Sequence, residues 1–280
     1  MVRPWRHASL RYGGVSDGQH RLVFVCGLHR SGTTLLARIL GGHPEVSGFA
    51  DTGVPEDEGQ HLQGVYPPAK IYGGPGRFGF DERAHLTEAS PLVGEGSRER
   101  LLAAWSPHWD LSRPLLVEKS PPNLLKTRFL QALFPDASFV VLVRHPVAVS
   151  LATAKWRQTR RYDLLVEHWL HCHELFEGDR PHLERVHVLL YEDLVRDPAA
   201  ALAGVLGFLG LEGEPPPADL DPGPNRRYFE RWRALAKNGL FWRAYFPLLT
   251  ARYERRTRRF GYSLRDLERA DGWATPASGA

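Results

Sequence analysis

Cysteine and lysine are scarce in this sequence of 280 residues. It has two cysteines and only five lysines, which stand against 31 arginines. Two cysteines cannot build the disulfide framework that holds small secreted domains together. Cys26 falls in a predicted strand, where a buried free thiol is the usual state, and no pattern supports a bond from it to Cys172. We therefore expect free thiols and a reducing compartment.

Long apolar runs are also missing. No stretch of about 18 consecutive apolar residues occurs, which is the length needed to cross a bilayer. The first twenty residues carry Arg3, Arg6 and Arg11 but no apolar segment of signal-peptide length. These absences predict that no segment spans a membrane and that the protein is cytoplasmic.

The charge is only mildly basic, at +4 for pH 7, and the excess comes from arginine. No dense basic run interleaves with aromatic residues, so the sequence lacks the footprint of a nucleic-acid binder. Arginine pairs bidentately with phosphate and sulfate, so small anionic ligands suit this composition better. The arginine bias, together with 27 glycines and 22 prolines, favours a bacterial source rich in G and C.

The most informative segment is residues 21–41, RLVFVCGLHRSGTTLLARILG. Its apolar, β-branched start predicts a buried strand over 22–26. A tight turn with glycines at both ends follows over 27–32, and a helix with an apolar face begins at Thr33. Backbone N–H groups and the positive end of the helix dipole then form a cradle for a phosphate-sized anion.

One position distinguishes this loop from a nucleoside-triphosphate loop. The pattern GxxxxGK[ST] requires a lysine where this chain has Thr33. Without that lysine, the terminal phosphates of ATP lose their usual partner, and the cation of the loop is Arg30 instead. We expect one phosphate-sized group in the cradle, with the reacting group of the ligand beside Arg30.

Four segments in matching order resemble sulfotransferases that use 3′-phosphoadenosine 5′-phosphosulfate (PAPS). GLHRSGTTLL, over 27–36, is similar to their loop for the 5′-phosphosulfate group. VEKSPPN, over 117–123, resembles a segment of carbohydrate and protein sulfotransferases. FVVLVRHPVAVS, over 139–150, resembles the strand, turn and helix that hold the 3′-phosphate, and residues 188–211 resemble the segment that begins Tyr-Glu-Asp-Leu. The resemblance covers about residues 21–211.

The predicted elements and the resemblance imply an α/β fold, with a parallel β-sheet flanked by helices on both faces. This is the P-loop nucleotide-hydrolase-like fold of sulfotransferases, here with a helical C-terminal region. Strands are expected at 22–26, 115–117, 138–143 and 186–190, and helices at 33–40, 97–106, 123–134, 147–158 and 163–177.

The chain is expected to form one main domain rather than two. We divide it into an N-terminal extension (1–20), a single domain (21–262) and a C-terminal tail (263–280). Residues 51–80 are rich in glycine and proline without any period, so they are expected to form an acceptor or lid loop. A proline-rich linker over 214–224 leads into the helical region at 224–262.

The resemblance implies where the donor binds. The 5′-phosphate and the bridging oxygen would lie in the turn, beside the Arg30 side chain. Lys119 follows a short predicted strand and would bring a second cation to the sulfuryl group. Strand ends of a parallel sheet meet at one edge, which is where these cations fall. The cradle residues are Gly27, Arg30, Ser31, Gly32, Thr33 and Thr34.

Arg144 directly follows the clearest buried strand, where an unpaired charge is costly unless it meets an anion. The resemblance implies that Arg144 binds the 3′-phosphate together with a hydroxyl eight residues later, but position 152 is alanine. Ser150 is our first choice for that hydroxyl, and Thr153 is held in reserve. Tyr191 matches the tyrosine near the adenine in these enzymes. Arg226 and Arg227 are candidates for the last contact, although no motif fixes them.

A general base must reach the acceptor hydroxyl. Related enzymes often place it after the first strand-helix unit, where this chain has an acidic cluster over 56–61. Glu58 is the first choice, followed by Glu56 and His61, although a solvated acidic loop is a common fate for such a run. Glu118 lies next to Lys119 on a strand and therefore points the opposite way.

A histidine-rich stretch over 168–173 is the main alternative feature. His168 and Cys172 share a helix face, but no second ligand pair of standard spacing exists, so no metal is expected.

The expected function is transfer of the sulfuryl group of PAPS to a hydroxyl or amine by in-line displacement, without a metal or covalent intermediate. The acceptor could be a carbohydrate, a peptide tyrosine or a small molecule, and the oligomeric state is open. The alternative is a P-loop kinase-like phosphotransferase or a non-catalytic nucleotide-binding module. Thr33, Lys119 and Arg144 favour the first interpretation.

Overall fold

A computed structural model describes residues 11–12, 15–16, 19–216, 220–221 and 223–273 of the chain. The predicted N-terminal extension, the linker over 214–224 and the C-terminal tail therefore lie partly outside the described residues. Within them, Arg11–Tyr12 (β1) and Val15–Ser16 (β2) form a small antiparallel pair near the start of the chain.

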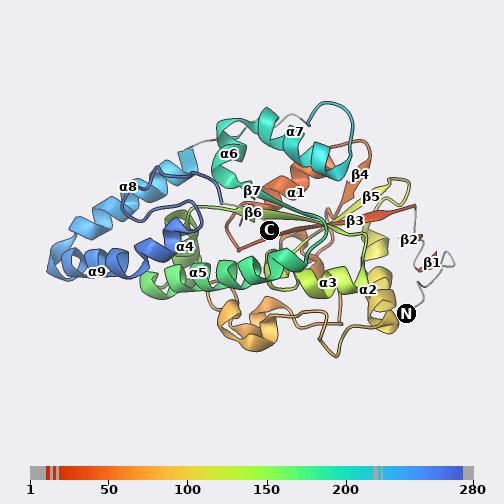
Figure 1. The fold of residues 1–280 in the computed structure, drawn as a ribbon, viewed down its shortest axis with the longest axis horizontal. Coiled ribbons are helices and arrows are strands. Elements are labelled where there is room, and N and C mark those ends of the chain that lie inside the picture. The colour runs from red at the N-terminus through yellow and green to blue at the C-terminus, as the bar shows by residue number, and fades with distance from the viewer. Residues whose placement is uncertain (1–10, 13–14, 17–18, 217–219, 222, 274–280) are drawn as a thin grey trace, which may run out of the picture.

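The centre of the molecule is a parallel sheet of five strands among the described residues, with the order β4-β5-β3-β6-β7 (Figure 1). The expected fold class is therefore confirmed. The four strands expected at 22–26, 115–117, 138–143 and 186–190 all form, whereas β4 was not predicted. The strands are β3 (Arg21–Gly27), β4 (Val46–Gly48), β5 (Leu115–Lys119), β6 (Ser138–Val143) and β7 (Val186–Leu190).

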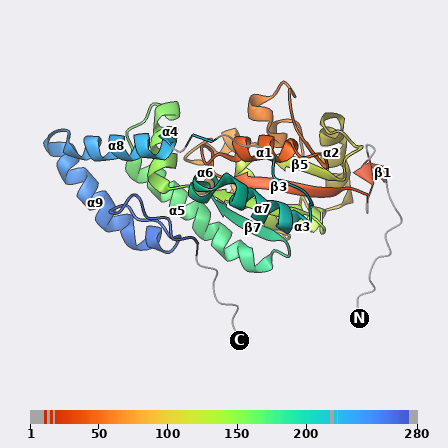
Figure 2. The same ribbon diagram turned by 90° about the horizontal axis from the view of Figure 1, so that it is seen from above.

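Helices cover both faces of the sheet (Figures 1 and 2). One face carries α1 (Thr33–Gly41), α6 (Tyr191–Arg196) and α7 (Pro198–Leu209). The opposite face carries α2 (Glu95–Trp105), α3 (Thr127–Leu133), α4 (Pro146–Arg157) and α5 (Tyr162–Asp179).

Alternation along the strands explains this layering. On β3, Leu22, Phe24 and Cys26 join the hydrophobic cluster of one face, and Val23 and Val25 join that of the other. Side chains of a strand point alternately to opposite faces, so a strand that is apolar at every position needs cover on both. The run of apolar residues in β3 thus requires the two helical layers.

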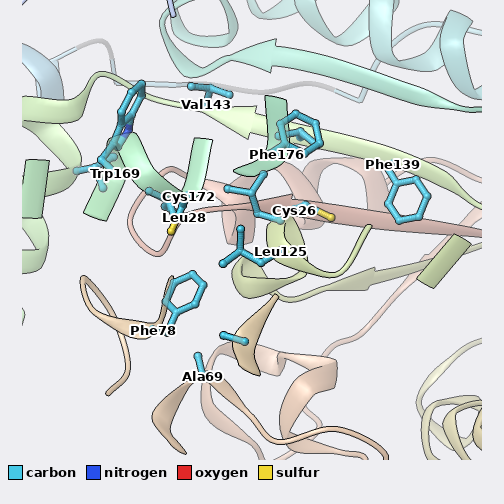
Figure 3. Close-up of a cluster of buried hydrophobic side chains, with 14 of the residues drawn as sticks. Cys26, Leu28, Ala69, Phe78, Leu125, Phe139, Val143, Trp169, Cys172 and Phe176 are labelled. Carbon is cyan, nitrogen blue, oxygen red and sulfur yellow. The ribbon is translucent and has the colours of Figure 1, made fainter. Parts of the chain in front are cut away.

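The segment 51–80 is packed rather than loose. It consists of short 3₁₀ helices at Pro55–Asp57, Gly59–His61, Ala69–Tyr72 and Phe78–Phe80. Figure 3 shows Ala69 and Phe78 from this segment against the core residues Leu28, Leu125 and Cys172. The sequence does not predict this packing, because each 3₁₀ helix is too short to show a periodic pattern of apolar residues.

The C-terminal region forms two long helices, α8 (Gly223–Lys237) and α9 (Gly239–Arg258), which project from the body at one end (Figures 1 and 2). After them the chain returns to the core, where Leu264, Leu267 and Trp273 are buried. The described part of the 263–280 segment is therefore packed. Among the described residues, no helix is both long enough and apolar enough to cross a bilayer.

Candidate active site

The carboxyl-terminal edge of the sheet collects the polar residues that follow its strands. In the strand register, Val25 of β3 pairs with Lys119 of β5, and Gly27 pairs with Leu142 of β6. The turn after β3, Lys119 and Arg144 are therefore brought to one edge. A cleft of about 380 Å³ opens there, and Arg30, Thr33, Thr34, Glu56, Glu58 and Arg144 are among the residues that line it.

The turn between β3 and α1 has a left-handed backbone at two positions. Arg30 has φ 72° and Gly32 has φ 103°. A side chain at Gly32 would place its Cβ 2.9 Å from the ring of Tyr191, so this position needs glycine for both conformation and space. Gly27 is also tight, because a Cβ there would lie 2.5 Å from the carbonyl oxygen of Leu142.

Ser31 holds the turn together from within. Its hydroxyl donates to the carbonyl oxygen of Leu28 at 2.7 Å, and its N–H donates to the same oxygen at 3.0 Å. Neither group therefore faces the cleft. No side chain caps the start of α1 among the described residues. The first-turn N–H groups at Thr33 and Thr34 are thus left for an anion at the positive end of the helix dipole.

Lys119 lies beside Glu58, which lines the cleft, although Lys119 itself is not among the lining residues. The ammonium of Lys119 lies 3.4 Å from Glu58 Oε1 and donates to the carbonyl oxygen of Glu56 at 2.6 Å. Both side chains are nearly inaccessible, at 5% and 7%. Gln60 donates from Nε2 to the other Glu58 oxygen and accepts from the N–H of Ala69 at 2.9 Å. Glu58 is therefore fixed from both sides.

The acidic cluster differs in how its members are placed. Glu56 and Glu58 line the cleft, and the hydroxyl of Thr34 donates to Glu56 Oε2 at 3.3 Å. His61 lies 3.8 Å from Glu58 Oε2 but does not line the cleft. Burial raises the pKa of Glu58, and the Lys119 charge partly offsets this rise. Burial lowers the pKa of His61. Glu58 is thus a carboxyl group that takes up a proton more readily than an exposed one.

The backbone around Glu56 is strained. Glu56 and the next residue, Asp57, both have positive φ, at 55° and 50°. Asp57 is held by Thr52, whose N–H and hydroxyl donate to its carboxylate at 2.8 and 2.7 Å. Non-glycine residues rarely adopt this conformation, and they cluster where a chain serves a site.

Glu118 points away from the cleft, as strand alternation predicts. It is fully buried, and it accepts hydrogen bonds from Ser120 and Asn123, each at 2.5 Å. Burial raises its pKa to about 7. The hydroxyl of Ser120 also accepts from the N–H of Gln60 at 2.9 Å. Glu118 therefore anchors the segment that carries Glu58 instead of facing the ligand.

Arg144 also lines the cleft, beside the turn between β3 and α1. Its Nε donates to Asn225 Oδ1 at 2.8 Å, and Nη1 donates to the carbonyl oxygen of Arg30 at 3.1 Å. The guanidinium lies 4.0 Å from the ring centroid of Tyr191. Nη2 is buried and has no hydrogen-bond partner among the described residues. A buried cation with a free donor at a cleft fits an anionic ligand.

Four other residues predicted for the donor site are not among those that line the cleft. Ser150 and Thr153 face a different small hollow, whereas Ala152 lines the cleft. Arg226 and Arg227 are exposed on α8, where they pair with Glu230 and Asp221.

Several cleft residues carry no sequence motif. From α8, Tyr228 lines the cleft and Asn225 holds Arg144. Trp156 of α4 lines it as well, 5.8 Å from the Arg30 guanidinium. His29, inside the turn, is buried, and its pKa falls to about 3, mainly because of burial. His29 is therefore neutral and contributes shape rather than charge.

The histidine-rich stretch is structural. The Gly79 N–H donates to His168 Nε2 at 3.1 Å, which ties the 51–80 segment to α5. Cys172 lies beside this ring, and Cys26 and Cys172 are both buried free thiols. No group of three metal-ligating side chains is assembled within the described part of the chain.

An α/β fold with a phosphate-type loop and cations at three strand ends defines the class of this protein. A family model described as the sulfotransferase family matches residues 23–215. This chain therefore belongs to the sulfotransferase family.

Individual relatives are distant. Protein-tyrosine sulfotransferase 2 of Gallus gallus is 25% identical over 216 residues, which cover 73% of this chain and 54% of that protein. An uncharacterized protein of Aquifex aeolicus is 26% identical over 231 residues, which cover 73% of this chain and 27% of that protein. This chain thus spans about half the length of the first relative and less of the second.

Among solved structures, the sulfotransferase domain from the Synechococcus PCC 7002 olefin synthase has a TM-score of 0.52 and 20% identity. The match covers 93% of this chain and 99% of that domain. This likeness confirms the sulfotransferase fold.

Proposed function

We propose that this chain transfers the sulfuryl group of PAPS to a hydroxyl-bearing acceptor. The observation that carries the proposal is the cleft lined by the uncapped start of α1, Arg144 and Glu58, with the Lys119 ammonium 3.4 Å from Glu58. An acceptor oxygen attacks sulfur, the bond between sulfur and the 5′-phosphate oxygen breaks, and 3′-phosphoadenosine 5′-phosphate (PAP) leaves. No metal enters this step.

Each group in the cleft has a part in the proposal. The N–H groups of Thr33 and Thr34 and the guanidinium of Arg30 stabilise the charge that develops on the leaving phosphate. Glu58 takes the proton of the attacking hydroxyl, and Lys119 holds the resulting carboxylic acid in place beside it. Arg144 takes the 3′-phosphate through its free Nη2. Gly27, Gly32, Ser31 and Tyr191 shape the cradle.

The acceptor lies on the Glu58 side of the cleft in this proposal. The segment 51–80 supplies both cleft carboxylates, so we propose that it shapes the acceptor pocket. Trp156 offers an exposed aromatic wall. Carbohydrate, peptide tyrosine and small-molecule acceptors all present a suitable hydroxyl, and tyrosine is the one named for the relative from Gallus gallus. The cytoplasmic location and bacterial source stay predictions.

The kinase-like alternative is weaker. Thr33 stands where a triphosphate loop needs lysine, and the residue directly after β6 is Arg144 rather than an aspartate for Mg²⁺.

Arg30→Ala tests the proposal. Loss of the guanidinium should weaken PAP binding and lower sulfuryl transfer from labelled PAPS by a factor of a hundred or more, because about 3 kcal/mol of charge stabilisation is lost. Arg30→Lys should recover part of the loss, since it keeps the charge without the two-pronged geometry. Undiminished transfer by Arg30→Ala would contradict the assignment of the cradle.

A further inference from the structure

Arg144 is held at the cleft by a chain of hydrogen bonds that involves α8, α6 and the segment after α9. Asn225 of α8 accepts from Arg144 and donates to Glu192 Oε1 at 2.6 Å. Glu192 Oε2 accepts from the hydroxyl of Tyr262 at 2.7 Å. The N–H of His145 donates to Glu192 as well, at 3.0 Å. Arg144 is therefore held at Nε and Nη1, while Nη2 has no hydrogen-bond partner among the described residues.

The N–H groups of one nitrogen, Nη2, are few hydrogen-bond donors for a phosphate group. A phosphate has three terminal oxygens that each accept hydrogen bonds, and buried polar atoms without partners cost free energy. A second donor is therefore expected close to Nη2. Helix α4 does not supply it, since position 152, which faces the cleft, is alanine. Ser150 and Thr153 lie on another side of the same helix.

Tyr228, which carries a hydroxyl group, lies near Arg144. It comes from α8, which packs beside α4 (Figures 1 and 2), and it lines the cleft together with Ala152 and Arg144. The Arg144 guanidinium lies 5.7 Å from the centroid of the Tyr228 ring. Asn225, which holds Arg144, is three residues earlier on the same helix and so shares its face.

We infer that the Tyr228 hydroxyl binds the 3′-phosphate of the donor beside Arg144, in place of the hydroxyl that α4 lacks at position 152. This assignment rests on the proposed function, because it takes PAPS as the donor. It makes Tyr228 a specificity-determining residue and Asn225 a positioning residue for Arg144. It also makes α8 part of the donor site.

The test compares two nucleotides that differ only in the 3′-phosphate. PAP and AMP are titrated calorimetrically into the full chain, and the ratio of their dissociation constants measures how strongly the 3′-phosphate is recognised. Tyr228→Phe removes the hydroxyl and keeps the ring against Arg144. We expect PAP affinity to fall about tenfold and AMP affinity to stay within twofold, as for loss of one hydrogen bond to a charged group.

A second substitution tests whether the hydroxyl removed from Tyr228 bound the 3′-phosphate next to position 152. Ala152→Ser in the Tyr228→Phe background returns a hydroxyl to α4 and should restore most of the PAP affinity. Tyr245→Phe is the matched control, because its hydroxyl is bonded to Asp163 outside the cleft. It should leave the ratio unchanged, and a melting curve of each variant confirms folding.

The inference and the proposed function fail in different ways. A wild-type chain that binds AMP as tightly as PAP contradicts PAPS as the donor. A wild-type preference for PAP that survives in Tyr228→Phe overturns the role of Tyr228 alone. A parallel fall in PAP and AMP affinity, or a fall that Ala152→Ser does not reverse, overturns it too.

Discussion

The pair of Glu58 and Lys119 shows how single side chains are prepared for chemistry in this protein. Glu58 is buried, is fixed by Gln60, and faces an ammonium at 3.4 Å. Burial favours the neutral acid, while the neighbouring cation favours the carboxylate, and burial is the larger effect. A base with a raised pKa accepts a proton more readily than an ordinary glutamate does.

Glu58→Gln removes that base and keeps the shape of the side chain. Under the proposed function, sulfuryl transfer should fall by a factor of about 10² to 10⁴, while PAP affinity stays nearly unchanged. In the wild type, kcat/KM should drop on acidification as Glu58 is protonated, at a pH above the ordinary glutamate value because the pKa is raised.

Glu56→Gln is the matched comparison, since Glu56 also lines the cleft. If Glu56→Gln abolishes transfer while Glu58→Gln does not, the base is Glu56 and our first choice is wrong.

Single residues also mark how far the sequence could predict the site. The glycines of the loop, Arg30 and Arg144 follow strands that the apolar runs of the sequence predict. Their meeting at the carboxyl-terminal edge of the sheet was therefore predictable. Ser150 lies two residues before position 152, which corresponds to about 200° around a helix, so the two side chains face different ways. Only the packing of α4 decides that Ala152 faces the cleft.

At the scale of elements, the 51–80 segment positions the candidate base. Gly59 packs against Glu118, and the adjoining Gln60 bonds to Ser120 after β5 and to Ala69 further along the segment. The sequence indicated a functional loop here but gave no period from which to predict its short turns. Likewise, Asn225 and Tyr228 reach the cleft only because α8 docks on α4, which no local pattern encodes.

Gly59→Ala tests how this segment is anchored. A Cβ at Gly59 would lie 2.4 Å from Glu118 Oε1, inside a buried network that cannot yield easily. The variant should lose about 1 to 3 kcal/mol of unfolding free energy, and transfer should fall as Glu58 shifts.

Gly64→Ala lies in the same segment, where an added Cβ meets nothing within 4 Å. Chemical denaturation should show this variant within about 0.5 kcal/mol of the wild type. Equal stability of the two variants would contradict close packing at Gly59.

The whole molecule buries several histidines in its interior. Burial lowers the pKa of His29 and His145 to about 3 and that of His173 to about 4. Their pKa in the unfolded chain is near 6.5, so between about pH 4 and 6.5 the unfolded state binds more protons. These histidines therefore contribute stability above pH 6.5 that is lost as the pH falls. Glu118 acts in the opposite direction, because its raised pKa favours folding at lower pH.

His145→Asn isolates one of these contributions. His145 accepts from the N–H of Val147 at the start of α4, and asparagine can serve as an acceptor there. Between pH 7.5 and 5.5 the variant should lose about 1 kcal/mol less unfolding free energy than the wild type, because one proton fewer is taken up on unfolding. Parallel stability curves for the two proteins across this range would show that His145 takes no proton on unfolding.

The layered architecture was the most predictable level of all. Four of the five strands of the described sheet contain apolar runs, and their parallel direction follows from the helices between them. The short strand β4 carries too little pattern to be recognised. The burial of Leu264, Leu267 and Trp273 in the core also depends on tertiary packing, which no local sequence pattern predicts.

The most direct test of the account is a calorimetric titration of the chain with PAP, compared with ADP and with ATP and Mg²⁺. The cleft is lined by a loop without the triphosphate lysine and by Arg144, whose Nη2 has no hydrogen-bond partner among the described residues. Tight binding of PAP, with much weaker binding of ADP and of ATP with Mg²⁺, is the predicted result. Preference for ATP with Mg²⁺ would contradict the account, because the cradle would then hold a triphosphate.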